Sequence, residues 1–243
     1  MNSTTEVNHE KLMELFGNVF NDVAGSMAIM MSYLGDQTGA YRAMDKLGPA
    51  TAEEIASESN VDERYLLEWL SSNAGRGYVT YHEETNHFSL SPEQAAVFAR
   101  ETEPTCIQGL VQGVVGQFVK EEVAVEVFKT GRGRPWGEHH ECCFCGTERF
   151  FRPAYAGHLL DEWIPAMEGV EAKLKKGAKV ADIGCGLGTS SMLMAEQYPN
   201  SIIHAFDFHE PSIEEAKKRA EEKGLTNFCL LYTSDAADDT LWV

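Results

Sequence analysis

The stretch AKVADIGCGLGTSSMLMAEQYPNSIIHAFDF, residues 178–208, decides the fold. Its first apolar run enters a glycine loop, TSSMLMAEQY is typical of a helix, and SIIHAFDF is typical of a second buried strand. A further helix is predicted in PSIEEAKKRAEEKG, where Pro211 suits the start and Gly224 the end. Ser212 and Glu215 have the spacing of a capping box. This β-α-β-α order predicts a parallel sheet with right-handed crossovers.

The glycine loop has the pattern D-x-G-x-G-x-G, formed by Asp182, Gly184, Gly186 and Gly188. Glycines let the backbone turn sharply and approach a ligand without a Cβ in the way. The loop follows the carboxyl end of the first strand, where open α/β sheets bind ligands. Asp207 ends the second strand, and a carboxylate there can accept hydrogen bonds from both hydroxyls of a ribose. The pattern therefore predicts a site for a nucleoside cofactor.

The spacing of the glycines bears on which nucleoside is bound. A dinucleotide fingerprint reads G-x-G-x-x-G, whereas Thr189 stands here in the place of the third glycine. The D-x-G-x-G-x-G loop together with Asp207 resembles motif I and the ribose-binding acid of class I S-adenosylmethionine-dependent methyltransferases. An NAD(P)-linked oxidoreductase and a non-catalytic relative are the alternatives.

Other segments extend this resemblance over roughly residues 12–228: LGDQTGAYRAM, ATAEEIA, DERYLLEWL, GTERFFRP and DEWIPAMEGVEAKLKKGAKVADIGCG. They are similar to winged-helix-bearing class I methyltransferases. The resemblance implies S-adenosyl-L-methionine as cofactor, a small-molecule methyl acceptor, a homodimer and a cytoplasmic enzyme. The cofactor-binding residues it implies are Asp182, Gly184, Cys185, Gly186, Gly188, Thr189, Asp207 and Phe208. No general base or other catalytic residue can be assigned.

The N-terminal part is predicted to be mainly α. Apolar residues at spacings of three and four predict a helix over 9–34. Three further helices followed by the hairpin YVTY–HEETN–HFSLS indicate a winged helix over 37–100, with Thr51 and Glu54 in a capping box and Asp62 as a cap. Residues 61–72, the third helix, hold three acids against one arginine, which is the wrong sign for a DNA reader. A transcriptional regulator is therefore the less favoured alternative.

Residues 105–129 are predicted to form one long apolar helix, either an interdomain or dimer helix or an ordinary buried one. Gly109 and Gly113 lie one turn apart, so that face can accept a close neighbour. The segment TGRGRPWGEHHECCFCG, 130–146, reads as a loop, and helical patterning returns over 147–176.

The loop concentrates histidine and cysteine. Cys142 and Cys145 have metal-ligand spacing, but a single pair is a weak signal, and no metal site is assigned. We predict instead that the segment lines the acceptor pocket, with His139, His140, Glu141 and Arg149 as candidate contacts. A surface loop ordered by Trp136 and Phe144, with Arg149 and Arg152 in ordinary salt bridges, is the alternative.

Composition narrows the partners. The 243 residues are 43% hydrophobic, which suffices for a core in one or two domains. With 20 Lys and Arg against 38 Asp and Glu, the net charge of −18 argues against nucleic acid and anionic membranes as partners. The apolar run at 27–34 is too short to span a bilayer, and no secretory signal is visible. Six unevenly spaced cysteines favour a reducing cytoplasm over a disulfide framework.

The last segment, CLLYTSDAADDTLWV at 229–243, breaks from this pattern. It back-translates into a string that resembles a transposase adapter of sequencing libraries, so we predict that it is translated adapter and that the gene was cut after Phe228. The parent would then be the enzyme and this fragment inactive, with a non-catalytic dimeric scaffold as the alternative.

The predicted divisions are 1–36, an N-terminal dimerisation helix; 37–100, the winged helix; 101–176, a helical linker with the substrate-side loop; 177–228, the start of a Rossmann-like domain; and 229–243, the non-native tail.

Overall fold

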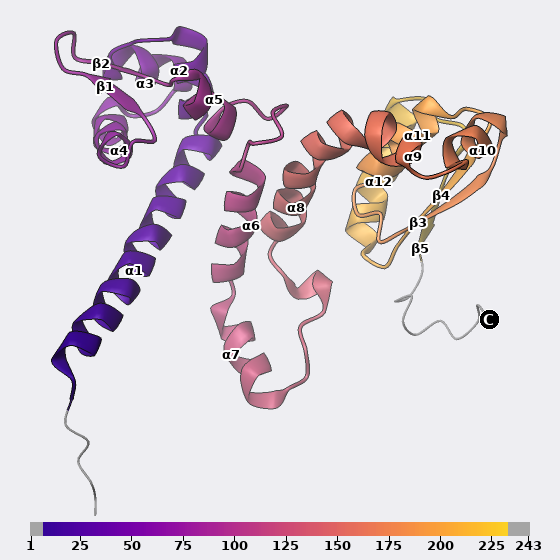
Figure 1. Cartoon of the computed structure of the whole chain (residues 1–243), viewed down its shortest axis with the longest axis horizontal. Coiled ribbons are helices and arrows are strands. Elements are labelled where there is room, and N and C mark those ends of the chain that lie inside the picture. The colour runs from indigo at the N-terminus through magenta and orange to yellow at the C-terminus, as the bar shows by residue number, and fades with distance from the viewer. Residues whose placement is uncertain (1–6, 233–243) are drawn as a thin grey trace, which may run out of the picture. The chain divides into compact units, whose positions relative to one another are not determined.

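The computed structural model describes residues 7–232 and divides the chain into two compact units, Met1–Arg100 and Glu101–Val243 (Figure 1). Among the described residues, no helix has the length and apolar character that crossing a membrane requires.

The first unit is a winged helix with a long helix before it. Its elements are α1 (His9–Gln37), α2 (Ala40–Leu47), α3 (Ala52–Ser59), α4 (Glu63–Gly75), β1 (Thr80–His82), β2 (His87–Ser89) and α5 (Pro92–Phe98). The strands pair antiparallel, as the hairpin pattern predicts. Thr51 and Glu54 form the predicted capping box, and Asp62 accepts from the backbone N–H of Tyr65.

An aromatic cluster fills the core of this unit. The ring of Tyr41 contacts Trp69 edge-on and stacks on Phe98, with centroids 4.9 and 5.0 Å apart. The Tyr41 hydroxyl donates to Oδ1 of buried Asn73 over 3.0 Å. Gly35 of α1 lies against Trp69 and Tyr41 so closely that a Cβ would collide with both rings. These contacts hold the C-terminal end of α1 on the winged helix.

The second unit begins with two helices where the sequence predicts one. α6 (Gln108–Phe118) and α7 (Glu121–Thr130) are separated because Val119 is extended and Lys120 is left-handed, with φ 63°. The prediction of one helix over 105–129 is therefore wrong. α6 buries Val111 and Gly116, whereas none of the residues that the structure describes in α7 is buried. Tertiary packing supplies most of the stability of helices in proteins. Because α7 has no buried residue among those described, packing does not favour its continuation along the axis of α6.

The neighbour of α6 is α8 (Glu141–Ala154) of the same unit, and the two lie side by side in Figure 1. The prediction of a loop over 130–146 is wrong for its last residues, because α8 begins at Glu141. His140 caps α8: its Nδ1 accepts from the backbone N–H of Cys142 over 3.2 Å. The short 3₁₀ helix η1 (Trp136–Glu138) lies in the remaining loop.

Helical structure continues beyond α8 as predicted. It comprises the π-helix η2 (Tyr155–Trp163), α9 (Ile164–Ala166) and α10 (Val170–Lys176). Ile164, Leu174 and Tyr198 form a buried cluster under these helices.

A three-stranded parallel sheet completes the unit, with strand order β3-β4-β5. Its elements are β3 (Lys179–Ile183), α11 (Thr189–Gln197), β4 (Ile202–Asp207), α12 (Glu210–Glu222) and β5 (Phe228–Tyr232). The sequence analysis predicts β3 and β4, the helices α11 and α12 that follow them, and their parallel pairing. The proposed capping box at α12 is wrong: Ser212 bonds to His209, and Glu215 pairs with Arg219.

The segment predicted to be adapter lies partly in this sheet. Its first four residues, 229–232, belong to β5 and pair with β4. Residues 233–243 lie outside the described part of the chain. The origin of the segment stays a prediction.

Candidate cofactor site

The glycine loop joins β3 to α11 at the carboxyl edge of the sheet. The backbone N–H groups of Gly184 and Cys185 both donate to the Phe206 carbonyl of β4, over 2.8 and 2.9 Å. Gly188 has a φ of 75°, a conformation that a side chain rarely adopts, and its Cβ would press on Ala216 and Phe228. The turn therefore requires glycine at position 188. The two hydrogen bonds to Phe206 hold the loop against β4.

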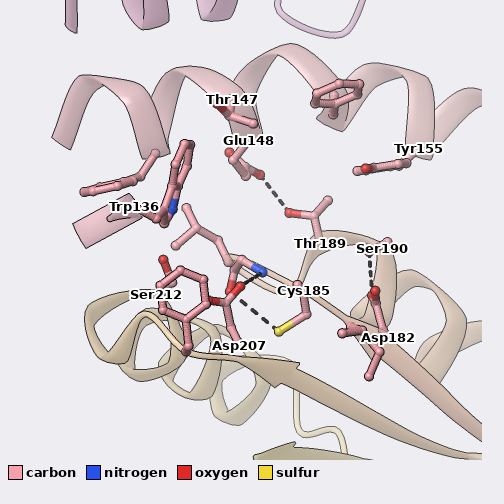
Figure 2. Close-up of a pocket in the computed structure, with 17 residues that line it drawn as sticks. Trp136, Thr147, Glu148, Tyr155, Asp182, Cys185, Thr189, Ser190, Asp207 and Ser212 are labelled. Atoms are coloured by element: carbon pink, nitrogen blue, oxygen red, sulfur yellow. Dashed lines mark hydrogen bonds between the residues drawn. The ribbon is translucent and has the colours of Figure 1, made fainter. Parts of the chain in front are cut away.

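The loop borders a pocket of about 440 Å³ within the second unit (Figure 2). One side comes from the sheet edge and α11, and the other from η1, α8 and the start of η2. Seven of the eight predicted cofactor residues line it: Asp182, Gly184, Cys185, Gly186, Thr189, Asp207 and Phe208. Gly188 is not among the described lining residues, although it closes the turn. The sequence shows only the order of these residues along the chain. The structure shows that residues from two strands, the glycine loop and one helix line the same pocket.

Asp182 is held from one side. Its Oδ2 accepts hydrogen bonds from the hydroxyls of Ser190 and Ser191 in the first turn of α11, over 2.8 and 2.6 Å. A carboxylate offers about four acceptor positions, so the group retains capacity toward the pocket.

Asp207 fixes the loop from the second strand. Its Oδ2 accepts from the backbone N–H of Gly186 and its Oδ1 from that of His209, each over 2.8 Å. The residue is 9% exposed, and this exposed part faces the pocket. Each oxygen has a second lone pair for a ligand hydroxyl.

Cys185 is the only thiol among the lining residues that the structure describes. Burial, and then the negative charges of Asp207 and Asp182, raise its pKa to about 12. The thiol therefore stays protonated at neutral pH and is a poor nucleophile.

Aromatic side chains form much of the opposite wall. Trp136, Phe144, Phe151 and Tyr155 line the pocket, and the ring of Phe144 contacts that of His209 at a tilt, with centroids 4.3 Å apart. Burial, and then the charge of Asp182, raise the pKa of the Tyr155 hydroxyl. The sequence predicts a role for Trp136 and Phe144 only in ordering a loop, and none for Tyr155.

Glu148 on α8, like Tyr155, lines the pocket without having been predicted from the sequence. Its Oε1 accepts from the hydroxyl of Thr189 over 2.7 Å, and Figure 2 shows the side chain directed from α8 toward Thr189. The segment GTERFFRP draws attention to this region, but no local pattern marks a contact across 41 residues.

The predicted acceptor residues lie elsewhere: none of His139, His140, Glu141 and Arg149 is among the described lining residues. His140 caps α8, and the ring of His139 contacts that of Trp136 at a tilt, with centroids 5.5 Å apart. Burial, and then the charge of Arg134, lower the pKa of His139. Arg149 donates to Gln112 and Glu101 over 2.7 and 2.6 Å, which is the salt-bridge alternative. Their role toward an acceptor stays a prediction.

Two of the three cysteines in α8 serve packing, and the third, Cys145, is exposed. Cys142 and Cys143 are buried, and Cys143 lies against Gly116 of α6. Within residues 7–232, no group of three or more His, Cys, Asp or Glu side chains is placed to hold a metal ion.

Comparison with known proteins identifies a domain in each unit. Residues 25–100 match the family described as Rv2258c-like winged HTH domain, and residues 174–238 match a methyltransferase domain. The uncharacterized protein YbxB of Bacillus subtilis strain 168 is 34% identical over 56 residues, which are 23% of this chain and 27% of YbxB. The chain thus spans about a quarter of that relative.

Solved methyltransferase structures share the fold. Mitomycin 7-O-methyltransferase MmcR aligns with a TM-score of 0.63 at 16% identity, covering 94% of this chain and 68% of its own. Human N-acetylserotonin methyltransferase, solved in complex with SAM, aligns at 0.58 and 11%, covering 96% and 68%. An O-methyltransferase family protein from Burkholderia thailandensis aligns at 0.58 and 14%, covering 95% and 65%.

These identities are low, so the solved structures establish the fold alone, over about two thirds of their length. The two family matches identify the parts of the chain. This protein combines an Rv2258c-like winged HTH domain with a methyltransferase domain that begins at about residue 174.

Proposed function

We propose that the parent protein transfers a methyl group from S-adenosyl-L-methionine to a small-molecule acceptor. One observation carries the proposal: Asp182 and Asp207, at the carboxyl ends of adjacent parallel strands, flank a glycine loop in one pocket of a methyltransferase domain. A structural neighbour with the same fold is solved in complex with SAM, which supports the choice of cofactor.

The residues present suit this cofactor. Asp207 would accept from the ribose hydroxyls with its remaining lone pairs, and the loop from Gly184 to Gly188 would lie against the methionine part. Phe208, next to Asp207, offers a partly exposed ring for the base. The cofactor supplies a sulfonium-bound methyl group, and its positive charge is compatible with the lining carboxylates of Glu148, Asp182 and Asp207.

The chain's contribution to the transfer is alignment. Displacement at a sulfonium carbon needs the acceptor atom and the methyl carbon held in line, and a base only where the acceptor carries a proton. The aromatic side chains of Trp136, Phe144, Phe151 and Tyr155 form an apolar wall on one side of the pocket. We assign no base.

Binding tests this proposal better than turnover, because the sequence predicts that this chain alone is inactive. S-adenosylhomocysteine is titrated into the purified 243-residue chain by calorimetry, for the wild type and for Asp207→Ala. We expect saturable binding that weakens about tenfold in the variant, the equivalent of one or two lost hydrogen bonds. Absence of binding to the wild type would refute the proposed function; equal affinities would remove Asp207 from the site.

We further propose that the protein is a homodimer in which α1 pairs with α1 of a second copy. Large apolar side chains recur along α1 and are exposed: Leu12, Leu15, Phe16, Val19, Phe20, Val23 and Met27. A stripe of this length on a 29-residue helix is typical of helix pairing, and a second copy of the chain offers a matching one. The cytoplasm remains the predicted compartment.

A further inference from the structure

The N-terminus of α11 is where phosphate-binding α/β folds place the phosphate of their ligand. Backbone N–H groups and the helix dipole give such an end a partial positive charge, about half an elementary charge. In this chain, a carboxylate of the protein bonds to the side chain of the first residue of this helix. Glu148 Oε1 is 2.7 Å from the hydroxyl of Thr189, the first residue of α11, and Figure 2 shows this bond beside the glycine loop.

Two arginines hold this carboxylate in place. Nε of Arg152 donates to Glu148 Oε1 over 2.9 Å, and the other oxygen accepts from the same guanidinium. Arg219 of α12 lies 3.5 Å from Oε1. Only 9% of the Glu148 side chain is exposed. Burial acts to raise its pKa, but the bonds from Arg152 and Thr189 and both arginine charges outweigh it, and the pKa lies below its ordinary value. Glu148 is therefore ionised at neutral pH.

The rest of the pocket has the same sign of charge. Glu148, Asp182 and Asp207 all line it, and the lining residues that the structure describes include no Lys, Arg or His. A phosphate group near the glycine loop would meet three carboxylates in the lining, whereas Arg152 and Arg219 pair with Glu148 and are not among the described lining residues. S-adenosylmethionine carries a single carboxylate, and its ammonium and sulfonium charges offset that carboxylate, so it meets less repulsion than a phosphate-bearing ligand.

We propose that Glu148 determines cofactor specificity: its carboxylate fills the anion position at the N-terminus of α11, so the pocket accepts an adenosine cofactor without phosphate and rejects phosphate-bearing nucleotides. This inference rests on the proposed function only in placing an adenosine cofactor in this pocket. Glu148 acts by occupying space and by charge, and it takes no part in the methyl transfer.

The test compares binding of adenosine, AMP, ADP and S-adenosylhomocysteine to the 243-residue chain by calorimetry. In the wild type we expect affinity to fall from adenosine to AMP to ADP. In Glu148→Gln, which leaves Arg152 and Arg219 without their shared carboxylate, the affinity for ADP rises about tenfold. The affinity for S-adenosylhomocysteine changes less than about threefold, because its single carboxylate is offset by its own ammonium group.

Two further variants serve as controls. Glu215→Gln removes another carboxylate partner of Arg219 outside the pocket lining, so it should leave the affinity for ADP unchanged. Glu148→Asp keeps the charge and should keep the rejection of ADP. If Glu148→Gln fails to fold by circular dichroism, the wild-type series decides, since an anion site at this helix end would reverse its order.

Three outcomes overturn the inference. They are wild-type affinity that rises with each phosphate, an unchanged affinity for ADP in folded Glu148→Gln, or the same gain in Glu215→Gln. The second outcome, if it comes with loss of S-adenosylhomocysteine binding, would show that Glu148 contacts the cofactor instead. A different result would show that the proposed function is wrong: S-adenosylhomocysteine would not bind the wild type, independently of the affinity for ADP.

Discussion

At the scale of single residues, Gly146 sets how closely α8 approaches α6. A Cβ on Gly146 would lie 2.5 Å from the Gly113 nitrogen and 2.6 Å from the Gly109 carbonyl oxygen. Both neighbours are backbone atoms, which cannot move aside as the end of a flexible side chain can. The spacing of Gly109 and Gly113 predicts a close neighbour for this face, but not that the neighbour is a glycine in the same chain.

Gly146→Ala is therefore expected to destabilise the second unit. Forcing two packed helices apart costs about 1–3 kcal/mol, measured as a lower free energy of unfolding in urea. Gly113→Ala is the matched control, because a Cβ there meets no atom within 4 Å. That variant should gain about 0.5–1 kcal/mol from helix propensity. Equal effects of the two substitutions would contradict the close approach seen at Gly146.

At the scale of elements, Glu148 joins three helices. It belongs to α8, bonds to Thr189 at the start of α11 and pairs with Arg219 of α12. These interactions depress its pKa, so the unfolded chain takes up a proton at this residue more readily than the folded one. The stability that Glu148 contributes is thus fully present above its unfolded pKa, about 4.3. It is lost as the pH falls through the lower folded pKa.

This sign yields a prediction for the docking of α8. The free energy of unfolding should fall more steeply on acidification below about pH 4.3 in the wild type than in Glu148→Gln, which has no proton to take up there. Denaturant titrations at neutral pH and at several acidic values measure the free energy of unfolding of both proteins. The other carboxylates are common to both, so their contributions largely cancel in the difference between the two free energies. Parallel pH curves would show that Glu148 does not tie α8 to α11.

The same scale shows what a sequence can predict here. β3, the glycine loop and α11 follow from local pattern, because apolar runs and glycines at fixed spacing encode them directly. The break at Lys120 depends on which helix packs against α8, and a capping box at Ser212 is displaced by its bond to His209. Glu148 meets Thr189 only after the chain has folded. Contacts between segments that are distant in the sequence produce no periodic pattern in it, so they cannot be predicted from local sequence.

At the scale of the whole molecule, α1 decides the predicted assembly. Buried residues of α1 begin at Ala28 and end at Asp36, within its C-terminal third. The preceding turns present Phe16 and Phe20, whose rings stack on each other with centroids 6.1 Å apart. Exposed apolar surface of this extent on a monomer is costly in water, and pairing with a second α1 removes it.

The double variant Phe16→Glu with Phe20→Glu should convert the dimer to a monomer. Four like charges would face one another across the helix pair, at positions where apolar contact supplies the affinity, so the dimer dissociation constant should rise at least about a hundredfold. Sedimentation equilibrium over a range of concentrations measures this dissociation constant.

The control variant, Asn18→Glu with Asn21→Glu, adds the same charge to exposed positions without removing an aromatic ring, and should leave the dimer largely intact. A wild-type chain that sediments as a monomer at every concentration would refute the pairing of α1. Equal dissociation in the two double variants would show that added charge alone separates the copies and that Phe16 and Phe20 have no specific part in the contact.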